Sequence, residues 1–424
     1  MYNNLYMRSF CLFFILCVFK LSAQEILPGA YQTQQYFPLL KDKNVAIFAN
    51  HTSTINHTHL VDSFLNSGIK VVKIFAPEHG FRGNADAGKK INNEVDEKTQ
   101  LPIISLYGKK TQPSAKDLDE VDILVFDIQD VGVRFYTFIS SLQYFIEAAI
   151  ENNKPLIILD RPNPNGFYID GPVLESNYKS FVGMQTVPIV YGMTIGEYAK
   201  MLIGEKWLSW KNIRKIDKRI SLGELLGFEQ EKNNFSLTVI SCKNYDHNSK
   251  YVLPIPPSPN LPNMQSVYWY PSTCLFEGTI MSEGRGTDYP FCIFGHPSFP
   301  KDLFSFKPIS KSGATHPKFM NQTCYGWNVY NEDVKATLAE LNQQLQISYL
   351  LKAYKLFENK NDFFIKPKSE LDTDYFFNKL VGSNQLKNQL QQQKTEHEIR
   401  KSWQPNLNKF KKLRKKYLLY KDFD

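Results

Sequence analysis

The sequence predicts an α/β fold in which a Rossmann-like parallel sheet domain is followed by a smaller α+β domain. Short continuous apolar runs alternate with helical patterns over the first half of the chain, as in a parallel sheet that helices cover on both faces. From about residue 185 the pattern changes to mixed helices and strands joined by long Pro-rich connections. The 424 residues are enough for two or three domains.

The apolar runs and the helical patterns predict the individual elements. The first-half strands are predicted at residues 45–49, 71–75, 103–107, 123–126 and 155–159. Helical patterns cover about 58–66 and 137–152, and Thr194 and Glu197 form a capping box that opens a further helix. We therefore interpret Glu197 as a cap and not as a catalytic residue. Later segments are predicted as strands at 237–240 and 267–270 and as a helix at 333–345.

Residues 1–23 have the pattern of a secretory signal peptide. Arg8 precedes an apolar run over 10–19, and a small-residue cleavage site ends at Ala23. Lys20 interrupts the run, which is then too short to span a bilayer. We expect an exported protein, periplasmic or secreted, without a transmembrane segment and with domains at 24–184 and 185–424.

The charge and the cysteines limit the possible partners. The net charge of +8 is concentrated in a predicted basic helix at 409–421, which is typical of a solvated face. No helix-turn-helix, RNA-binding-sheet or zinc-finger pattern accompanies it, so we expect no nucleic-acid partner. The cysteines after the leader form no Cys-x-x-Cys pair and are predicted to be buried free thiols, with one disulfide as the alternative; they are Cys242, Cys274, Cys292 and Cys324.

Polar side chains follow four of the predicted strands. They are Asn50, His51, Glu78, His79, Asp127, Asp130, Asp160 and Arg161. Ligands of open α/β sheets bind outside the carboxyl ends of the strands, so this arrangement predicts a site at that edge. Helix capping by Asp and Asn is the alternative, but it accounts for only one or two of these positions.

Several rigid Pro- and Gly-rich turns hold carboxylates, amides, Arg and aromatic rings together. They lie at 75–83, 160–166, 254–263 and 282–289. This mixture suits a polyhydroxylated ligand such as a sugar, and it predicts a carbohydrate-processing enzyme. Dinucleotide, P-loop, serine-esterase and His-Glu-x-x-His motifs are absent, so we expect no cofactor; a scattered metal site is the less favoured alternative.

Glycoside hydrolysis usually needs a carboxylic acid and a second carboxylate, although the acetamide of a 2-acetamido sugar can replace the nucleophile. We predict Glu78 as the general acid, because it follows a strand and Pro77 in a partly apolar turn. Its alternative role is pairing with Arg82. Glu283 and Asp127 are the other predicted catalytic carboxylates, and the identity of the second one stays open.

The remaining predicted site residues are substrate-binding. Arginines can bind a carboxylate bidentately and tyrosine rings can stack on sugar faces, while ion pairing within loops and core packing are their alternatives. The predicted substrate-binding residues are Asn50, His51, His79, Arg82, Asp130, Arg134, Tyr136, Asp160, Arg161, Asn163, Glu175, Asn260, Arg285, Asp288 and Tyr289.

Seven motifs together resemble the NamZ-type exo-β-N-acetylmuramidase family over roughly residues 40–420. They lie at 76–83 (Ala-Pro-Glu-His-Gly-Phe-Arg-Gly), 126–137, 160–164, 171–175, 191–194, 257–262 and 283–287. The resemblance implies a Rossmann-like domain, a smaller C-terminal domain and an active-site cleft between them. It implies release of N-acetylmuramic acid from the non-reducing end of peptidoglycan-derived glycans or muropeptides, without a cofactor.

The resemblance also bears on single residues. Glu78 lies in the Glu-His-Gly motif of the family, the strongest place for a catalytic carboxylate. The lactyl carboxylate of N-acetylmuramic acid gives an Arg in the cleft an obvious partner. Two other functions stay open: a non-catalytic muropeptide-binding protein on the same fold, and an amidase or esterase that acts on the lactyl-peptide arm.

Overall fold

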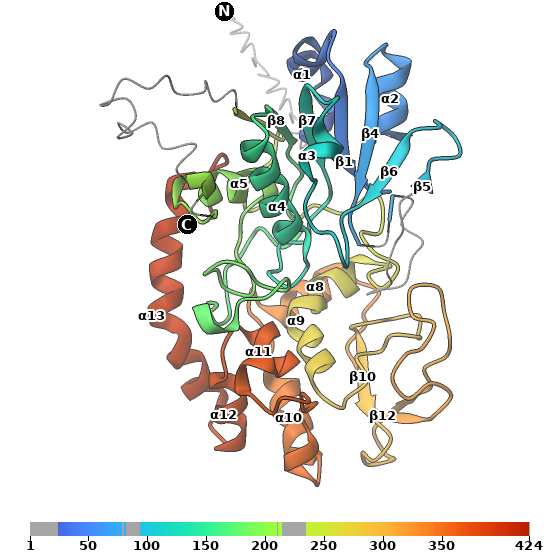
Figure 1. Cartoon of the computed structure of the whole chain (residues 1–424). Helices are drawn as coiled ribbons and strands as arrows, with labels where there is room; N and C mark the ends of the chain where they lie inside the picture. The colour runs from blue at the N-terminus through green and yellow to red at the C-terminus, as the bar shows by residue number, and fades with distance from the viewer. Residues whose placement is uncertain (1–23, 79, 82–93, 210, 214–234, 424) are drawn as a thin grey trace, which may run out of the picture.

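The computed structural model describes residues 24–78, 80–81, 94–209, 211–213 and 235–423 (Figure 1). Its main sheet has the strand order β5-β6-β4-β1-β7-β8-β9, and all neighbouring pairs are parallel except β5 with β6. The strands are β1 (Val45–Ala49), β4 (Val71–Ala76), β5 (Glu94–Val95), β6 (Pro102–Ser105), β7 (Ile123–Asp127), β8 (Leu156–Leu159) and β9 (Leu237–Ile240). The predicted parallel sheet is confirmed.

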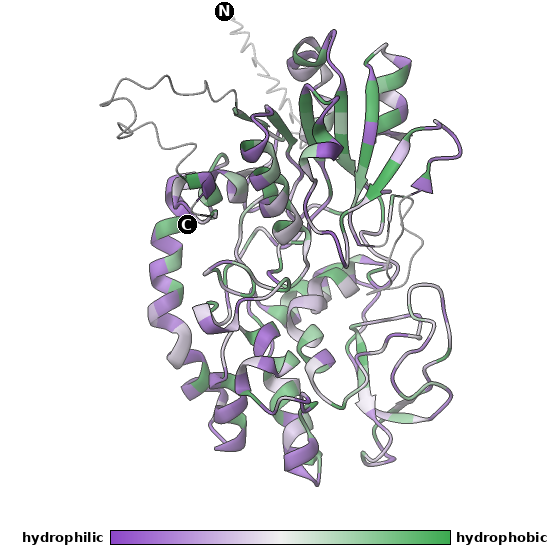
Figure 2. Ribbon diagram, in the orientation of Figure 1, coloured by the Kyte–Doolittle hydropathy of each residue, from purple (hydrophilic) through white to green (hydrophobic). Residues whose placement is uncertain are grey.

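Helices cover both faces of this sheet, as the continuous apolar strands predict. One face packs on α1 (Thr33–Leu40) and α2 (Leu60–Asn66), and the other packs on α3 (Ala115–Leu118), α4 (Phe138–Glu151) and α5 (Ile195–Gly204). Within β1, Val45 and Ile47 face the first layer, whereas Phe48 faces the second and stacks on Phe126 at 4.9 Å. Figure 2 shows these strands as a hydrophobic layer inside the domain.

The second, smaller domain follows the sheet domain and lies below it in Figure 1. Its antiparallel sheet has the order β10-β12-β11, formed by β10 (Ile293–His296), β11 (Phe304–Phe306) and β12 (Cys324–Asn328). Its helices are α8 (Met264–Thr273), α9 (Val334–Leu341), α10 (Ser348–Leu356), α11 (Phe376–Val381), α12 (Gln385–Gln391) and α13 (Glu396–Arg414). The predicted combination of an α/β domain with a smaller second domain is confirmed.

Several short elements complete the described part of the chain. The strands β2 (Thr54–Ile55) and β3 (Thr58–His59) form a small hairpin. The 3-10 helices are η1 (Gly29–Tyr31), η2 (Ser176–Tyr178), η3 (Cys274–Gly278), η4 (Lys360–Asp362), η5 (Asp372–Asp374) and η6 (Lys415–Tyr417).

Two predicted elements need correction. The segment 267–270 is part of helix α8 and not a strand, because the Asn263 side chain caps the helix by accepting from Ser266 N at 2.8 Å. The helix is buried on all sides, so its apolar residues carry no helical period and imitate a buried strand. The helix predicted at 333–345 ends at Leu341, because Asn342 and Gln343 take positive φ angles of 46° and 53°.

Some predictions from the sequence fall outside this description or stay untested. The predicted signal peptide, His79 and Arg82 lie outside the described residues, and export stays a prediction. The boundary at residue 184 also stays a prediction, although β9 enters the main sheet from beyond it. No helix in the described ranges is long and apolar enough to cross a membrane. The prediction of buried free thiols is confirmed for Cys242, Cys274, Cys292 and Cys324.

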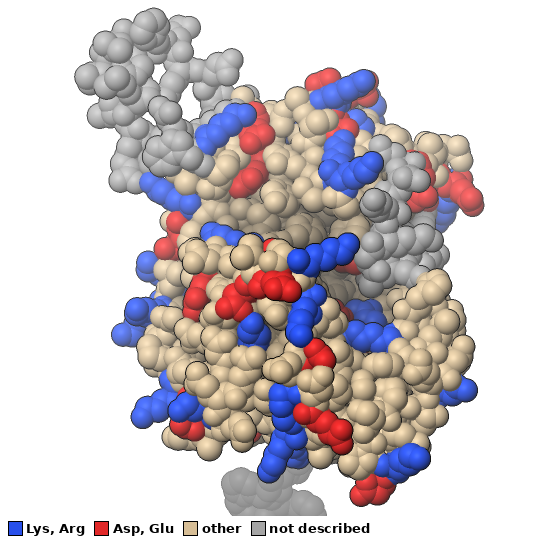
Figure 3. Space-filling model, turned by 60° about the horizontal axis from the view of Figure 1, so that its bottom comes forward, with Lys and Arg blue, Asp and Glu red and all other residues tan. Residues whose placement is uncertain are grey.

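The charged side chains are not segregated by sign on the face drawn in Figure 3. Lys and Arg stand beside Asp and Glu over most of this face, which is hollowed near its centre. The predicted basic helix at 409–421 is only partly helical. Helix α13 ends at Arg414, η6 follows, and the chain from Leu418 continues as a tail without regular structure.

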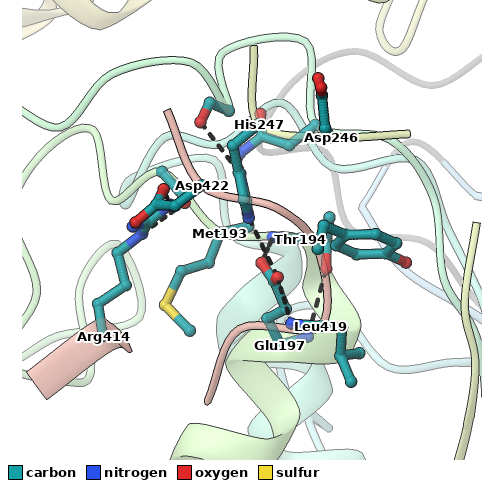
Figure 4. Close-up of polar contacts among 12 residues, drawn as sticks. Met193, Thr194, Glu197, Asp246, His247, Arg414, Leu419 and Asp422 are labelled. Atoms are coloured by element: carbon teal, nitrogen blue, oxygen red, sulfur yellow. Dashed lines mark hydrogen bonds and ion pairs between the residues drawn. The ribbon is translucent and has the colours of Figure 1, made fainter. Parts of the chain in front are cut away.

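This tail returns to the sheet domain and is held there by buried polar contacts (Figure 4). The buried Arg414 donates to Gly192 O at 2.7 Å and pairs with both oxygens of Asp422 at 2.7 and 2.9 Å. Glu197 accepts from Leu419 N at 2.8 Å and lies 3.1 Å from the buried His247 ring.

Glu197 also closes the capping box with Thr194, whose N–H donates to Glu197 Oε2 at 2.9 Å. The predicted capping role is confirmed. Because one carboxylate serves both the cap of α5 and the tail, it connects the start of α5 with the C-terminal tail.

Candidate active site

The strand order creates a crevice at the carboxyl edge of the main sheet. The chain passes from β1 to β4 and β6 on one side, and from β7 to β8 and β9 on the other, so the direction of winding reverses between β1 and β7. Ligands of open α/β sheets bind at such a switch point. The loops after β1 and β7 are tied together, since Ser53 Oγ donates to Asp127 O and Gln129 N donates to Thr52 Oγ1 at 3.2 Å.

A pocket opens at this edge, between the sheet domain and the second domain. Its cavity has a volume of about 60 Å³ and opens into a wider recess, so that about 440 Å³ of empty space, part of it open solvent, lies among the lining residues. Its lining residues are Glu78, Phe135, Tyr136, Thr137, Phe138, Ser258, Asn260, Leu261, Tyr270, Arg285 and Phe291. The structure therefore brings four predicted site residues together: Glu78, Tyr136, Asn260 and Arg285.

Glu78 reaches the pocket from the turn that follows β4 and is half-buried there. Tyr107 Oη, which follows β6 at the same sheet edge, donates to Glu78 Oε1 at 3.0 Å. Burial, together with the Glu78 charge, raises the pKa of Tyr107, so its phenol remains a donor at neutral pH. Tyr107 was missing from the predicted site, although it closes the third predicted strand at the edge where the other polar residues were expected.

Tyr136 forms one wall of the pocket and joins the two halves of the molecule. Its hydroxyl donates to Pro257 O at 2.8 Å, in the Pro-rich 254–263 turn. Its ring makes edge contacts with Phe138 at 4.7 Å and Tyr270 at 5.9 Å. Burial and the nearby charges of Asp130 and Glu78 raise the pKa of Tyr136. The pocket wall is thus a rigid aromatic cluster with a neutral phenol in it.

Arg285 brings positive charge to the opposite wall. Its Nη2 donates to Glu277 Oε1 at 2.6 Å, and its Nε lies 3.5 Å from Glu283 Oε1. Burial alone would lower the pKa of Arg285, but the charges of Glu277 and Glu283 outweigh it and raise that pKa. The third nitrogen, Nη1, is buried and has no hydrogen-bond partner among the described residues. One donor of a fixed guanidinium therefore makes no hydrogen bond to the described part of the protein.

Lys318 completes the charge cluster around Glu283. Its Nζ lies 3.1 Å from Glu283 Oε2 and donates to four backbone carbonyls between residues 276 and 281 at 2.9–3.3 Å. Glu283, whose side chain is only 4% exposed, is thus held between two cations that compensate its charge. Lys318 was not predicted as a site residue, because its sequence context is typical of an exposed loop and it follows Glu283 by 35 residues in the chain.

Asp127, a predicted catalytic residue, lies in the core below the pocket. Its two oxygens accept from Arg161 Nε at 2.5 Å and Nη2 at 2.8 Å, and neither side chain is more than 4% exposed. Arg161 also donates to Thr54 O at 3.1 Å. These hydrogen bonds engage the side-chain atoms of Asp127 and Arg161 that would otherwise bind substrate or take part in catalysis. This geometry therefore favours a structural role for both residues.

Two further predicted binding residues are engaged by the protein itself. Arg134 is fully buried and donates to three backbone carbonyls, of Pro172, Val187 and Leu380, at 2.7–3.0 Å. Asp160 accepts hydrogen bonds at 2.6–2.8 Å from the side chains of Thr194 and Tyr420 and from Gly196 N. Burial raises the pKa of Asp160 to about 6. The charged groups of Arg134 and Asp160 are engaged in hydrogen bonds to loops and to the C-terminal tail. This geometry does not support the predicted contacts of the two residues with substrate.

Three predicted residues lie at the switch point beside the pocket. Burial raises the pKa of Asp130 to about 6; its Oδ2 accepts from Tyr191 Oη and Gly132 N, whereas its Oδ1 has no hydrogen-bond partner among the described residues. Asn50 Nδ2 is likewise buried without a partner in that part of the chain. His51 Nε2 lies 2.9 Å from Pro256 O. Asp130 Oδ1 and Asn50 Nδ2 are thus buried polar atoms without a described partner at the sheet edge.

The remaining predicted residues are placed elsewhere. Asn163 holds its own loop, accepting from Asn165 N and donating to Met193 O, both at 2.8 Å. Glu175 accepts from Gln385 at 3.0 Å, and Asp288 is 78% exposed and pairs with Lys311. The Tyr289 ring lies against that of Tyr330, with centroids 4.0 Å apart and planes tilted by 37°. In the described ranges, no cluster of three or more His, Cys, Asp or Glu side chains could hold a metal ion.

Comparisons with known proteins cover nearly the whole chain. The family model described as Exo-beta-N-acetylmuramidase NamZ, N-terminal, matches residues 45–265, and its C-terminal counterpart matches residues 268–420. The chain is 35% identical over 409 residues to the peptidoglycan beta-N-acetylmuramidase NamZ of Bacillus subtilis (strain 168), covering 91% of this chain and 89% of that protein.

Two crystal structures of DUF1343 family proteins from Bacteroides fragilis NCTC 9343 share the fold. One is 42% identical with a TM-score of 0.80 and covers 94% of this chain and 100% of its own. The other is 28% identical with a TM-score of 0.74 and covers 93% and 99%, respectively.

Proposed function

The chain belongs to the exo-beta-N-acetylmuramidase NamZ family and is a glycoside hydrolase, and we propose that it removes N-acetylmuramic acid from the non-reducing end of peptidoglycan fragments. The observation that carries this proposal is the single pocket that joins Glu78 from one domain to Arg285 from the other. A carboxyl group and a fixed cation facing one cavity suit a sugar that carries its own carboxylate.

In this proposal Glu78 protonates the glycosidic oxygen of the leaving group. General acid catalysis requires a carboxyl group at the cavity wall with a defined orientation. Tyr107 contributes to that orientation, because its hydroxyl donates to Glu78 Oε1 at 3.0 Å. Glu283 is our choice for the second carboxylate, acting on the substrate acetamide or on water, because it lies 3.5 Å from the pocket residue Arg285. Its ion-pair contacts of 3.1 and 3.5 Å are longer than the contacts of 2.5 and 2.8 Å that engage Asp127.

Arg285 Nη1 is the proposed partner of the lactyl carboxylate. Its other donors are held by Glu277 and Glu283, so the guanidinium is already oriented before the ligand arrives. The aromatic walls around Tyr136 and Tyr270 offer apolar faces to the sugar ring. These rings partly enclose the pocket, and we assign it to the terminal sugar.

Two chromogenic substrates test the reaction and the role of the lactyl group together. We expect the enzyme to release the chromophore from a β-N-acetylmuraminide at least about tenfold more efficiently than from the matching β-N-acetylglucosaminide, because a charge-assisted hydrogen bond is worth about 1.5–3 kcal/mol. The measurement is kcat/KM for both substrates under identical conditions. Equal efficiencies would contradict the proposed binding of the lactyl carboxylate by Arg285. Binding of muropeptides without any turnover would favour the non-catalytic alternative.

A further inference from the structure

A second hollow lies beside the active-site pocket on the surface of the sheet domain. It has a volume of about 600 Å³ and lies over α4, next to the chain segments 179–185 and 206–209. Tyr144, Phe181 and Trp207 are half-buried in its lining, so part of each ring remains accessible. Neither the fold nor the proposed chemistry at Glu78 accounts for aromatic rings arranged around an open hollow.

A row of aromatic rings connects this hollow to the active site. Tyr107 donates its hydroxyl to Glu78 at 3.0 Å, and its ring centroid lies 6.2 Å from that of Phe181. Phe181 in turn stacks on Tyr144, with centroids 6.3 Å apart and ring planes only 11° from parallel. The row therefore begins at the proposed general acid and ends in the hollow.

Resting on the proposed function, we infer that this hollow binds the leaving-group part of the glycan, that is, the sugars on the reducing-end side of the cleaved bond. A general acid donates its proton to the leaving-group oxygen, so the leaving group must lie on the side of Glu78 away from the terminal sugar. The row from Tyr107 to Tyr144 starts at Glu78 and leads out of the pocket. Its rings present flat apolar surfaces of the kind that bind sugar faces.

The polar groups of the hollow are held in place before any ligand binds. Gln185 Nε2 donates to Gln143 Oε1 and to Trp207 O, both at 2.8 Å. Gln143 donates to Glu147 at 3.2 Å, and Glu147 accepts from Ser209 N at 2.9 Å. This network fixes the floor between the rings, and preorganised polar groups among aromatic side chains are typical of small-ligand sites.

A cation at the rim matches the chemistry of the expected ligand. Lys179 is exposed, and its Nζ lies 3.5 Å from Gln185 Oε1, at the limit of hydrogen bonding. Peptidoglycan alternates N-acetylglucosamine with N-acetylmuramic acid, whose lactyl group or stem peptide carries carboxylates. The first leaving-group sugar would then stack near Phe181, and a carboxylate of the following muramoyl unit would meet Lys179.

The test compares short and long substrates in variants of the hollow. We measure kcat/KM for the chromogenic β-N-acetylmuraminide and for a peptidoglycan tetrasaccharide with N-acetylmuramic acid at its non-reducing end. In Tyr144→Ala and Lys179→Gln, the ratio of long-substrate to short-substrate efficiency should fall by about three- to tenfold, mainly through KM. Phe181→Ala should lower the same ratio, and Phe37→Ala, a half-buried ring on α1 at the opposite sheet face, should leave it unchanged.

The two proposals fail in different ways. If wild-type protein hydrolyses neither substrate, the proposed function is wrong. If wild-type protein hydrolyses both and all three variants keep the wild-type ratio, the function stands and the leaving-group site is wrong. A fall of both efficiencies by the same factor, with a lowered unfolding temperature, would show that the rings only support the fold, and it would also overturn the inference.

Discussion

Replacing Glu78 by Gln is expected to lower kcat by about 10²- to 10⁴-fold while glycan affinity stays close to that of the wild type. Gln has the same shape and can still accept the Tyr107 hydrogen bond through its amide oxygen, so the pocket should keep its geometry. It cannot protonate the glycosidic oxygen. The measurements are kcat on the chromogenic β-N-acetylmuraminide and calorimetric binding of a muropeptide.

A matched substitution elsewhere controls for nonspecific effects. Glu120→Gln changes an exposed glutamate outside the pocket and should leave both kcat and affinity at the wild-type values. If Glu78→Gln turned over substrate as fast as the wild type, Glu78 would lose its role as general acid. If it lost affinity as well as turnover, Glu78 would be a binding residue and the acid would have to be sought elsewhere.

Replacing Asp127 by Asn should destabilise the protein by about 3–5 kcal/mol, because it leaves the buried Arg161 without its compensating charge. Asp127 is 0% exposed and binds both Nε and Nη2 of Arg161, so no solvent can take its place. The measurement is the midpoint of chemical or thermal unfolding. The control is Asp288→Asn, which breaks an ion pair of a 78% exposed side chain and should cost at most about 1 kcal/mol.

This experiment also decides between the two roles considered for Asp127. A stable Asp127→Asn variant without activity would restore the catalytic role predicted from the sequence. A destabilised variant whose stability is partly regained when Arg161 is replaced by Met would establish the buried pair as structural, because the double change removes both charges at once.

The fold was predictable from the sequence wherever burial left a clear pattern. The strands β1, β4, β7 and β8 are short apolar runs between helical patterns, and the Thr194–Glu197 capping box marks the start of α5. Helix α8 was not predictable as a helix, because burial on all sides removes the alternation that separates a helix from a strand. The family was predictable from its motifs, and the comparisons confirm it.

The location of the candidate site was predictable from the sequence, but the roles of its individual residues were not. Glu78 and Arg285 do line one pocket, as their positions in rigid turns suggested. Arg134 looked equally suitable, yet one of its acceptors, Leu380 O, lies 246 positions away in the chain. Asp160 is similar, with Tyr420 as a partner 260 positions away. Partners so far away in the chain leave no pattern in the local sequence. A charged residue that is paired in the core therefore cannot be distinguished by sequence from a charged residue in a binding site.

The products formed from glycans with defined non-reducing ends show directly whether the enzyme is an exo-acting N-acetylmuramidase. We expect N-acetylmuramyl-β-1,4-N-acetylglucosamine to be split into equal amounts of its two sugars, and longer chains to release N-acetylmuramic acid only from a terminal position. Chains that begin with N-acetylglucosamine should stay intact. Internal fragments from such chains, or an untouched disaccharide, would contradict the assignment of this pocket to an exo-acting N-acetylmuramidase.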